Sequence, residues 1–276
     1  MSYEHVTLDK ANHIATLKLN RPDKLNAFNP KMYRELAQAA TEISDDDDIR
    51  VGILTGAGRA FSAGADVKQR FQKEIDARDR GRSNITHQQP RYPNGTTDLT
   101  AVRQPMIAAI NGVAVGVGYN LALQCDIRIM ADSARIRLPF TSLSQVPEAH
   151  SSYYLPRLIG LGKAFELWFT SRFVEAEEAL EIGLVNQVVP AAELHDCAQE
   201  MAKQIARNAP TALMLTKRIG YLGVNADMNS ARNFENFAMD YARSQKDFKE
   251  AISAFGEKRE PKFTCLLYTS PSPRDS

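Results

Sequence analysis

The chain has few cysteines, no excess of one charge and no apolar leader, and each absence excludes a class of protein. Cys125, Cys197 and Cys265 are too few and too scattered in 276 residues for a disulfide framework or a zinc site. The five histidines show no metal-ligand spacing, so we expect no metal. A net charge of +1 gives no electrostatic reason to bind nucleic acid or anionic membranes. The first residues, MSYEHVTLDK, contain no apolar signal segment, so we expect no secretion signal and a soluble protein of a reducing compartment.

One uncharged stretch, from Met106 to Leu123, has about the length of a membrane helix. However, it contains an Asn-Gly turn signal at 111–112 and further glycines at 116 and 118, which break an even helix. We therefore predict a buried strand (Met106–Ile110), a glycine-rich turn and a helix from about Gly116, inside a layered α/β domain.

Hydrophobic periodicity predicts the other elements. Strands are expected at Val6–Leu8, Ile14–Leu19, Val51–Leu54, Ile127–Met130, Ile136–Leu138 and Leu184–Val189, and helices at Pro30–Ile43 and near 66, 161–170 and 175–182. The polar segment 72–100 reads as a surface insertion or lid. From Ala191 to about Phe255 the pattern is helical, with an apolar face that could pack on the body or on a neighbouring subunit. We predict an α/β core over 1–190, a helical subdomain over 191–263 and a tail over 264–276 that is not part of the fold.

Two glycine-rich loops each lie between a predicted strand and a predicted helix, at Gly58–Asp66 (GRAFSAGAD) and Asn111–Asn120 (NGVAVGVGYN). Neither loop has the spacing of a dinucleotide fingerprint, a phosphate-binding P-loop or a nucleophile elbow. Backbone N–H groups at two helix starts could together form an oxyanion hole. From the pattern alone, tight packing of turn and helix is the simpler explanation.

The set RPDKLNAF (21–28), FSAGAD (61–66), INGVAVGVGYNLALQCDI (110–127) and LPFTSLSQVPEAHSSYYLPRLIG (138–160) resembles the enoyl-CoA hydratase/isomerase family, the crotonase superfamily, over about residues 3–263. The resemblance implies a spiral of repeated ββα units with a C-terminal helical trimerisation region. It also implies an acyl-CoA thioester substrate, a homotrimer or dimer of trimers, and no separate cofactor, because CoA is part of the substrate.

The resemblance assigns roles to individual residues. The thioester enolate would be stabilised by the backbone N–H groups of Ala63 and Val117, the latter at a position where the family more often has glycine. CoA would be bound by Lys24 and Ala27 in the first segment, and by Ala65, Asp66 and Val67 in the second.

Side chains decide which reaction such a site performs. By resemblance, hydratases of the family use two carboxylates, at the positions of Asn120 and Phe140, and neither an amide nor a phenyl ring exchanges protons at neutral pH. Glu148 matches the single catalytic acid of peroxisomal-type Δ3,Δ2-enoyl-CoA isomerases. We therefore expect Glu148 to move a proton from C2 to C4 of a 3-enoyl-CoA, although by pattern alone it is a first-turn helix glutamate.

Three alternatives remain open at this point. The chain could be a hydratase that uses Glu148 with another group, a dienoyl-CoA or aromatic-degradation isomerase, or a catalytically silent CoA-binding protein of the same fold. The expected compartment is the cytoplasm if the chain is bacterial, and the peroxisome or mitochondrion if it is eukaryotic.

Overall fold

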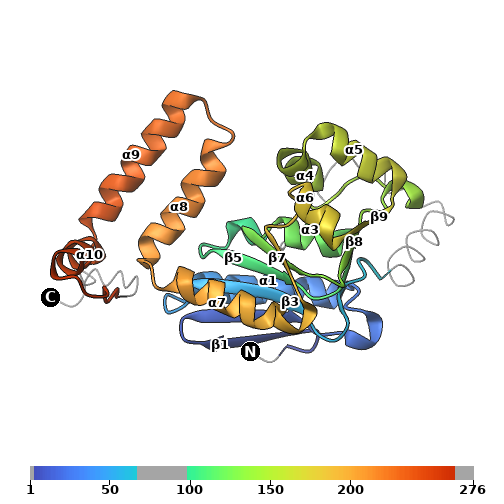
Figure 1. Ribbon diagram of the computed structural model, residues 1–276, viewed down its shortest axis with the longest axis horizontal. Helices are drawn as coiled ribbons and strands as arrows, with labels where there is room; N and C mark the ends of the chain where they lie inside the picture. The colour runs from blue at the N-terminus through green and yellow to red at the C-terminus, as the bar shows by residue number, and fades with distance from the viewer. Residues whose placement is uncertain (1–2, 67–97, 265–276) are drawn as a thin grey trace.

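The computed structural model describes residues 3–66 and 98–264, which form two β-sheets and the helices around them (Figure 1). The larger sheet has the order β1 (Val6–Ala11), β2 (Ile14–Leu19), β3 (Val51–Gly56), β5 (Met106–Ile110), β7 (Ile127–Ala131), β10 (Gln187–Val189). The smaller has the order β4 (Ala60–Ser62), β6 (Val113–Val115), β8 (Arg135–Arg137), β9 (Phe173–Glu175). Only β1–β2 and β8–β9 pair antiparallel; the other neighbours are parallel.

Successive strand pairs divide themselves between the two sheets. In β3–β4, β5–β6 and β7–β8, the first strand joins the larger sheet and the second joins the smaller one. Strands β3 and β5 are buried on both faces, which explains their nearly uninterrupted apolar sequences. This repetition confirms the predicted α/β fold of ββ units with intervening helices.

The α-helices are α1 (Pro30–Asp45), α3 (Val117–Leu123), α4 (Ser151–Ile159), α5 (Leu161–Thr170), α6 (Ala176–Glu181), α7 (Leu194–Ala206), α8 (Pro210–Gly223), α9 (Met228–Ser244) and α10 (Lys246–Glu257). Residues 3–66 and 98–264 also contain the short 3₁₀ helices η1 (Pro22–Lys24), η2 (Leu99–Ala101), η3 (Thr141–Leu143) and η4 (Ala191–Glu193). Helix α1 starts where its sequence predicts: Asn29 caps it by accepting the Met32 N–H at 2.8 Å, and Pro30 occupies the first turn. Its apolar stripe faces the core, in contact with β1 and β2.

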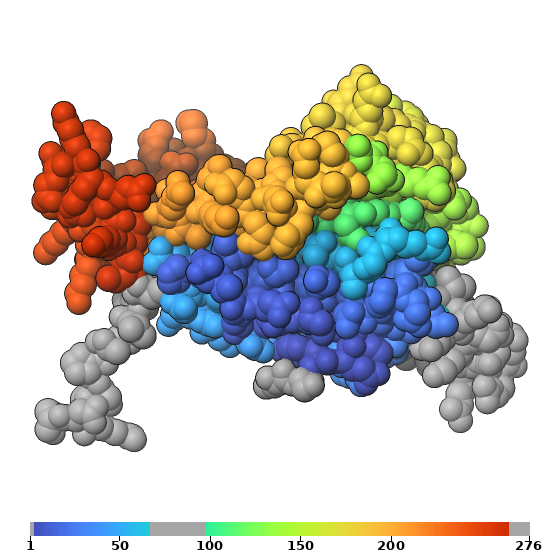
Figure 2. Space-filling view, turned by 60° about the horizontal axis from the view of Figure 1, so that its bottom comes forward, coloured from blue at the N-terminus to red at the C-terminus, as the bar shows by residue number. Residues whose placement is uncertain are grey.

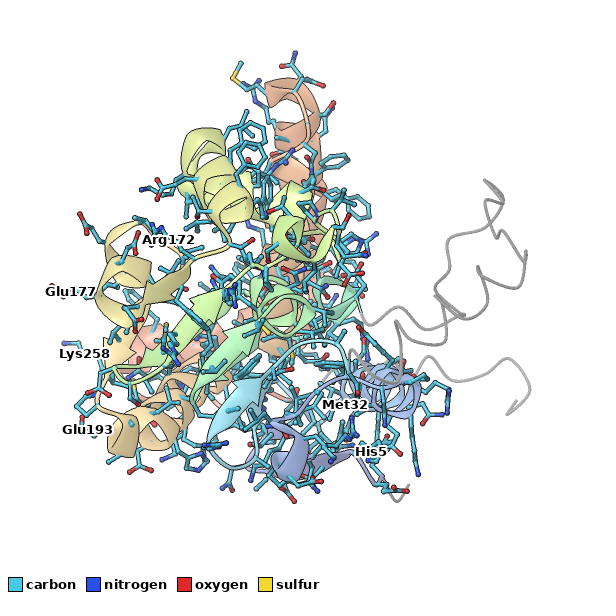
Figure 3. The ribbon with its side chains drawn as sticks, turned by 90° about the vertical axis from the view of Figure 1, so that its right-hand side faces the viewer. His5, Met32, Arg172, Glu177, Glu193 and Lys258 are labelled. Carbon is cyan, nitrogen blue, oxygen red and sulfur yellow. The ribbon has the colours of Figure 1, made fainter. Side chains whose placement is uncertain are left out.

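Helices α4, α5 and α6 form a separate group beside the smaller sheet. Arg172, which is labelled in Figure 3, joins α5 to α6, because its guanidinium lies 2.7 Å from Glu166 and 2.5 Å from Glu178. Hydrogen bonds from Lys163 and then from Arg172 lower the pKa of the Glu166 carboxyl, and the hydrogen bond from Arg172 lowers the pKa of Glu178. Because α4 packs against α5, the loop that precedes α4 is attached to helices that Arg172 links to each other.

The C-terminal helices leave the body in sequence. Helix α7 packs on the larger sheet through β2, β3, β5 and β7, whereas α8, α9 and α10 extend away from it (Figures 1 and 2). Lys217 attaches α8 to the body, with its Nζ 2.9 Å from Asp126 and donating to the Gln104 carbonyl at 3.0 Å. The division of the chain at residue 190 stays a prediction, and the packing of α7 favours a boundary after it.

Two predictions about local structure are wrong, and three short strands, β4, β6 and β9, were missed. The strand expected at Leu184–Val189 contains only its last three residues, and Glu148 does not belong to a helical turn, because α4 begins at Ser151. Strand β6 is only three residues long and follows directly after a turn, so periodicity could not reveal it. The helix expected near Asp66, most of the 72–100 insertion and nearly all of the tail lie outside the described residues.

Within residues 3–66 and 98–264, no helix combines the length and apolarity needed to cross a bilayer. The same ranges hold no group of three histidine, cysteine or acidic side chains placed to bind a metal ion.

Candidate active site

The two glycine-rich loops lie against each other, because the strands that lead into them are neighbours. Strand β4 pairs in parallel with β6, with Ser62 opposite Ala114, so both loops leave the same end of the smaller sheet. Gly64 has a φ of +90°, and a Cβ added to it would lie 2.8 Å from the carbonyl oxygen of Val115. A Cβ on Gly118 would lie 2.6 Å from the Cβ of Ser62. Only glycine permits this approach of one loop to the other.

The N–H of Ala63, one of the two expected oxyanion donors, is already used. It donates to the carbonyl of Leu25 at 2.8 Å, and the neighbouring Gly64 N–H donates to the Ser62 hydroxyl at 3.1 Å. Both groups hold the loop in place and are not available to a ligand. The expectation for Ala63 is therefore corrected.

The N–H of Ala65, unlike that of Ala63, is directed away from the segment that its own loop pairs with. Ala65 forms an isolated parallel bridge with Phe28, in which the Phe28 N–H donates to the Gly64 carbonyl at 2.7 Å and the Asp66 N–H donates to the Phe28 carbonyl at 2.9 Å. In such a bridge the N–H of the central residue points away from its partner strand. Among the described residues, no acceptor is found for the Ala65 N–H.

The N–H of Val117 is available for a different reason. Val117 is the first residue of α3, and the first N–H groups of a helix have no intrahelical acceptor. The first turn closes through the Asn120 N–H on the Gly116 carbonyl at 3.0 Å. In the part of the chain that the structure describes, the Val117 N–H has no acceptor, and the contact between the two loops brings it to the same region as Ala65.

The RPDKLNAF turn is pinned to the first loop by a residue that sequence reasoning did not single out. Asn26 is fully buried, and its amide donates to the carbonyls of Ala57 and Ala60 at 2.9 and 2.8 Å. Its backbone carbonyl accepts the Ser62 hydroxyl at 2.8 Å. Asn26 has a left-handed φ of 54°, a backbone conformation that asparagine tolerates well. The presence of an asparagine in this turn is therefore the signal by which the sequence could have pointed to this residue.

The expected CoA-binding residues lie on these two joined segments. Lys24 ends η1 and is exposed to solvent, whereas Ala27 is half-buried and its carbonyl accepts from Arg21 at 2.5 Å. The same guanidinium lies 3.5 Å from the carboxylate of Asp66 in the other segment. Arg21 and Asp66 therefore clamp the two segments together. Val67, also expected to face CoA, lies outside the described residues.

Glu148 lies in a turn just before α4. The next two residues, Ala149 and His150, both have left-handed backbones, with φ of 49° and 64°. The carbonyl of Glu148 accepts the Asn120 amide at 2.8 Å and the Ser151 N–H at 3.0 Å. The side chain is half-buried, as suits a group that must meet both a substrate and solvent.

The two positions at which a hydratase would carry its carboxylates hold an asparagine and a phenylalanine in this chain. Asn120 is fully buried with its amide on the Glu148 carbonyl, and Phe140 is 5% exposed at the start of η3. Of the three positions to which the resemblance assigns acid–base chemistry, only that of Glu148 carries a carboxyl group.

Aromatic rings connect the Glu148 turn with α8. Tyr154 packs edge-on against His150, Tyr153 and Tyr221, with centroids 6.3, 4.9 and 6.2 Å away. Burial raises the pKa of both Tyr154 and Tyr221, and the Tyr221 hydroxyl donates to Asp126 at 2.9 Å. Both phenols are therefore neutral at physiological pH.

Comparison with known proteins connects this geometry to a family. The family model described as enoyl-CoA hydratase/isomerase matches residues 9–265. A short-chain-enoyl-CoA hydratase of Clostridium acetobutylicum is 38% identical over 261 residues, covering 94% of this chain and 97% of that protein. A 1,2-epoxyphenylacetyl-CoA isomerase of Escherichia coli is 37% identical, covering 91% and 95%. An enoyl-CoA hydratase structure from Bacillus anthracis has a TM-score of 0.84 at 38% identity, covering 94% of this chain and 99% of that one.

Hydratase is the commoner name among the similar curated proteins, and this favours the hydratase alternative over the Δ3,Δ2-isomerase. The finer likeness to peroxisomal-type isomerases stays a prediction. The family model and the relatives nevertheless agree over nearly the whole length, and the expected fold is present. The chain belongs to the enoyl-CoA hydratase/isomerase family, the crotonase superfamily.

Proposed function

We propose that the chain is an acyl-CoA double-bond isomerase that converts a 3-enoyl-CoA into a 2-enoyl-CoA, with Glu148 as its only proton-transferring side chain. The observation that carries this proposal is that the chain has an acid at the position of the isomerase base and none at the two positions where hydratases have carboxylates. Glu148 is present, whereas the two hydratase positions hold the buried side chains of Asn120 and Phe140. A shift of a double bond needs one group that removes a proton and returns it, and no activated water.

The reaction follows from the two kinds of group in the site. The Glu148 carboxylate removes the proton from C2, and the electrons of that C–H bond move into the thioester carbonyl to form a dienolate. The N–H groups of Ala65 and Val117 would donate to the resulting oxyanion. Protonation at C4 by the Glu148 carboxyl then forms the C2–C3 double bond and restores the carbonyl. A positioned base typically contributes about 10²–10⁴ in rate, and one oxyanion donor about 10²–10³.

The CoA part of the substrate would lie along the clamped segments. The exposed Lys24 supplies a compact positive charge for a CoA phosphate. Ala27, Ala65 and Asp66 belong to the two segments that Arg21 and Asn26 hold together. We include Val67 with them on the resemblance alone.

A hydratase is the second candidate, and the names of the relatives favour it. It would need a group besides Glu148 to activate water. An isomerase acting on an aromatic acyl-CoA is a variant of the first candidate, supported by the relative from Escherichia coli.

The deciding experiment supplies the purified protein with 3-enoyl-CoA and, separately, with 2-enoyl-CoA. We expect conjugated 2-enoyl-CoA from the first, measured by its absorbance, and no sustained 3-hydroxyacyl-CoA from the second. The substitution Glu148→Gln should lower turnover by about 10²-fold or more, while the control Glu193→Gln changes an exposed glutamate and should leave turnover unchanged. Full turnover of Glu148→Gln would end the proposal, and sustained hydration would select the second candidate.

We also propose that the chain assembles as a homotrimer or a dimer of trimers through the helices beyond α7. Large apolar side chains remain exposed there, with Phe237 of α9 at 75% and Phe255 of α10 at 86%. Apolar patches of this kind mark contact sites between proteins.

A further inference from the structure

The turn that carries Glu148 has a backbone that its own residues do not favour. Ala149 and His150 are consecutive non-glycine residues with left-handed φ angles. Such a conformation is unfavourable for residues with a Cβ and persists only where surrounding contacts impose it. The position of the Glu148 carboxylate therefore depends on the groups that hold this turn.

Two amide side chains hold it, one from Asn120 of α3 and one from Gln124, the residue that caps the end of this helix. The Asn120 Nδ2 donates to the Glu148 carbonyl at 2.8 Å, and the Gln124 Nε2 donates to the Ala149 carbonyl at 3.2 Å. The two residues are four apart and so lie on one face of the helix. Gln124 also accepts the Leu99 N–H at 3.1 Å, whereas the Oδ1 of Asn120 is buried and has no hydrogen-bond partner in the described structure.

The unpartnered Oδ1 means that Asn120 does not serve the stability of the folded chain as well as an apolar residue would. Burying an acceptor without a donor is unfavourable, and an apolar residue of similar size would avoid that penalty. The asparagine retains one useful group, the N–H that donates to the Glu148 carbonyl.

Helix α3 also begins at Val117, whose N–H is the proposed oxyanion donor. Asn120 follows three residues later, about 4.5 Å further along the helix axis. One rigid element therefore fixes both an oxyanion donor and the turn that carries the base.

We propose that Asn120 is a positioning residue that sets the place of the Glu148 carboxylate relative to the oxyanion donors. This inference rests on the proposed role of Glu148. At a position where the resemblance puts a hydratase carboxylate, this chain has exchanged a group that transfers protons for one that holds the base in place.

The experiment replaces Asn120 by leucine, which has a similar volume and no donor. With 3-enoyl-CoA as the substrate we expect kcat to fall about 10–100-fold, because a misplacement of about 1 Å can cost 10²-fold. KM should change little, since CoA is held by other segments. Asn120→Ala is the second variant, in case leucine disturbs folding, and Cys125→Ala is a matched control at a buried site of the next turn. A wild-type kcat in folded Asn120→Leu or Asn120→Ala would overturn the inference.

A double-mutant cycle separates positioning from general damage. If Asn120 acts through Glu148, adding Asn120→Leu to Glu148→Gln should lower the residual kcat/KM by less than about twofold, because coupled residues are not additive. An undiminished further loss in the double variant would show a structural role and overturn the inference. If Glu148→Gln alone kept full turnover, the proposed function would fail, whatever Asn120 does.

Discussion

In the proposed mechanism Ala65 and Val117 contribute backbone N–H groups, which ordinary substitutions of their side chains leave in place. Proline is the exception, since it has no N–H, and the first position of a helix is where proline is best tolerated. Val117 occupies that position in α3. Its N–H can therefore be deleted with little expected harm to the helix.

We predict that Val117→Pro lowers kcat with 3-enoyl-CoA by about 10²–10³-fold, the typical effect of losing one oxyanion donor. Val117→Gly, which retains the N–H, should keep turnover within about tenfold of the wild type. Steady-state kinetics on both variants, with circular dichroism to verify folding, make the comparison. Equal activity in the two variants would remove Val117 from the oxyanion site.

The choice between Ala63 and Ala65 shows where reading a sequence stops. Both alanines flank the same glycine, and no local pattern says which N–H is engaged. The answer depends on Leu25 and Phe28, more than thirty residues earlier, because the carbonyl of the first accepts from Ala63 and the second bridges to Ala65. Long-range hydrogen bonds of this kind are set by the fold and not by spacing.

At the scale of elements, predictions succeed where one face of a helix or strand is buried. The hairpin of β1 and β2, helix α1 and strand β5 follow from periodicity. Periodicity cannot predict β6, because this strand has only three residues. Nor could the sequence predict the turn at Glu148, because its left-handed residues are neither glycine nor asparagine, the residue types that usually mark such turns. The hydrogen bonds that the buried amides of Asn26 and Asn120 donate were likewise found only from the structure.

The contact between α8 and the body predicts a dependence of stability on pH. Burial, followed by the charge of Asp126, raises the pKa of Tyr221 above its ordinary value of 10.0. Above about pH 10 the unfolded chain loses this phenolic proton while the folded chain keeps it, so unfolding becomes easier as pH rises.

We predict that urea unfolding at pH 9 and 10.5 shows this loss, at up to about 1.4 kcal/mol per pH unit for one proton. Tyr221→Phe has no proton to lose and should have a shallower slope, although it gives up the hydrogen bond to Asp126 at all pH values. Identical slopes for Tyr221→Phe and the wild type would contradict the assignment.

At the scale of the whole molecule, the proposed assembly of several chains rests on the apolar side chains that are exposed beyond α7. We predict a mass of three or six chains by light scattering. Phe237→Glu together with Phe255→Glu puts charges on two of the most exposed apolar positions and should shift the mass toward a single chain. Glu193→Gln should keep the larger mass. A wild-type protein that runs as one chain at micromolar concentration would exclude the proposed trimer.

The glycine contacts between the two loops have a consequence for how such a protein can acquire new chemistry. Gly64 and Gly118 touch backbone and Cβ atoms of the facing loop, so neither position accepts a larger residue without breaking that contact. The backbone N–H groups proposed to stabilise the oxyanion therefore tolerate few substitutions around them, whereas the proposed acid, Glu148, is a side chain that a single substitution can replace. The scaffold can therefore exchange one reaction for another by single substitutions and keep its shared intermediate throughout.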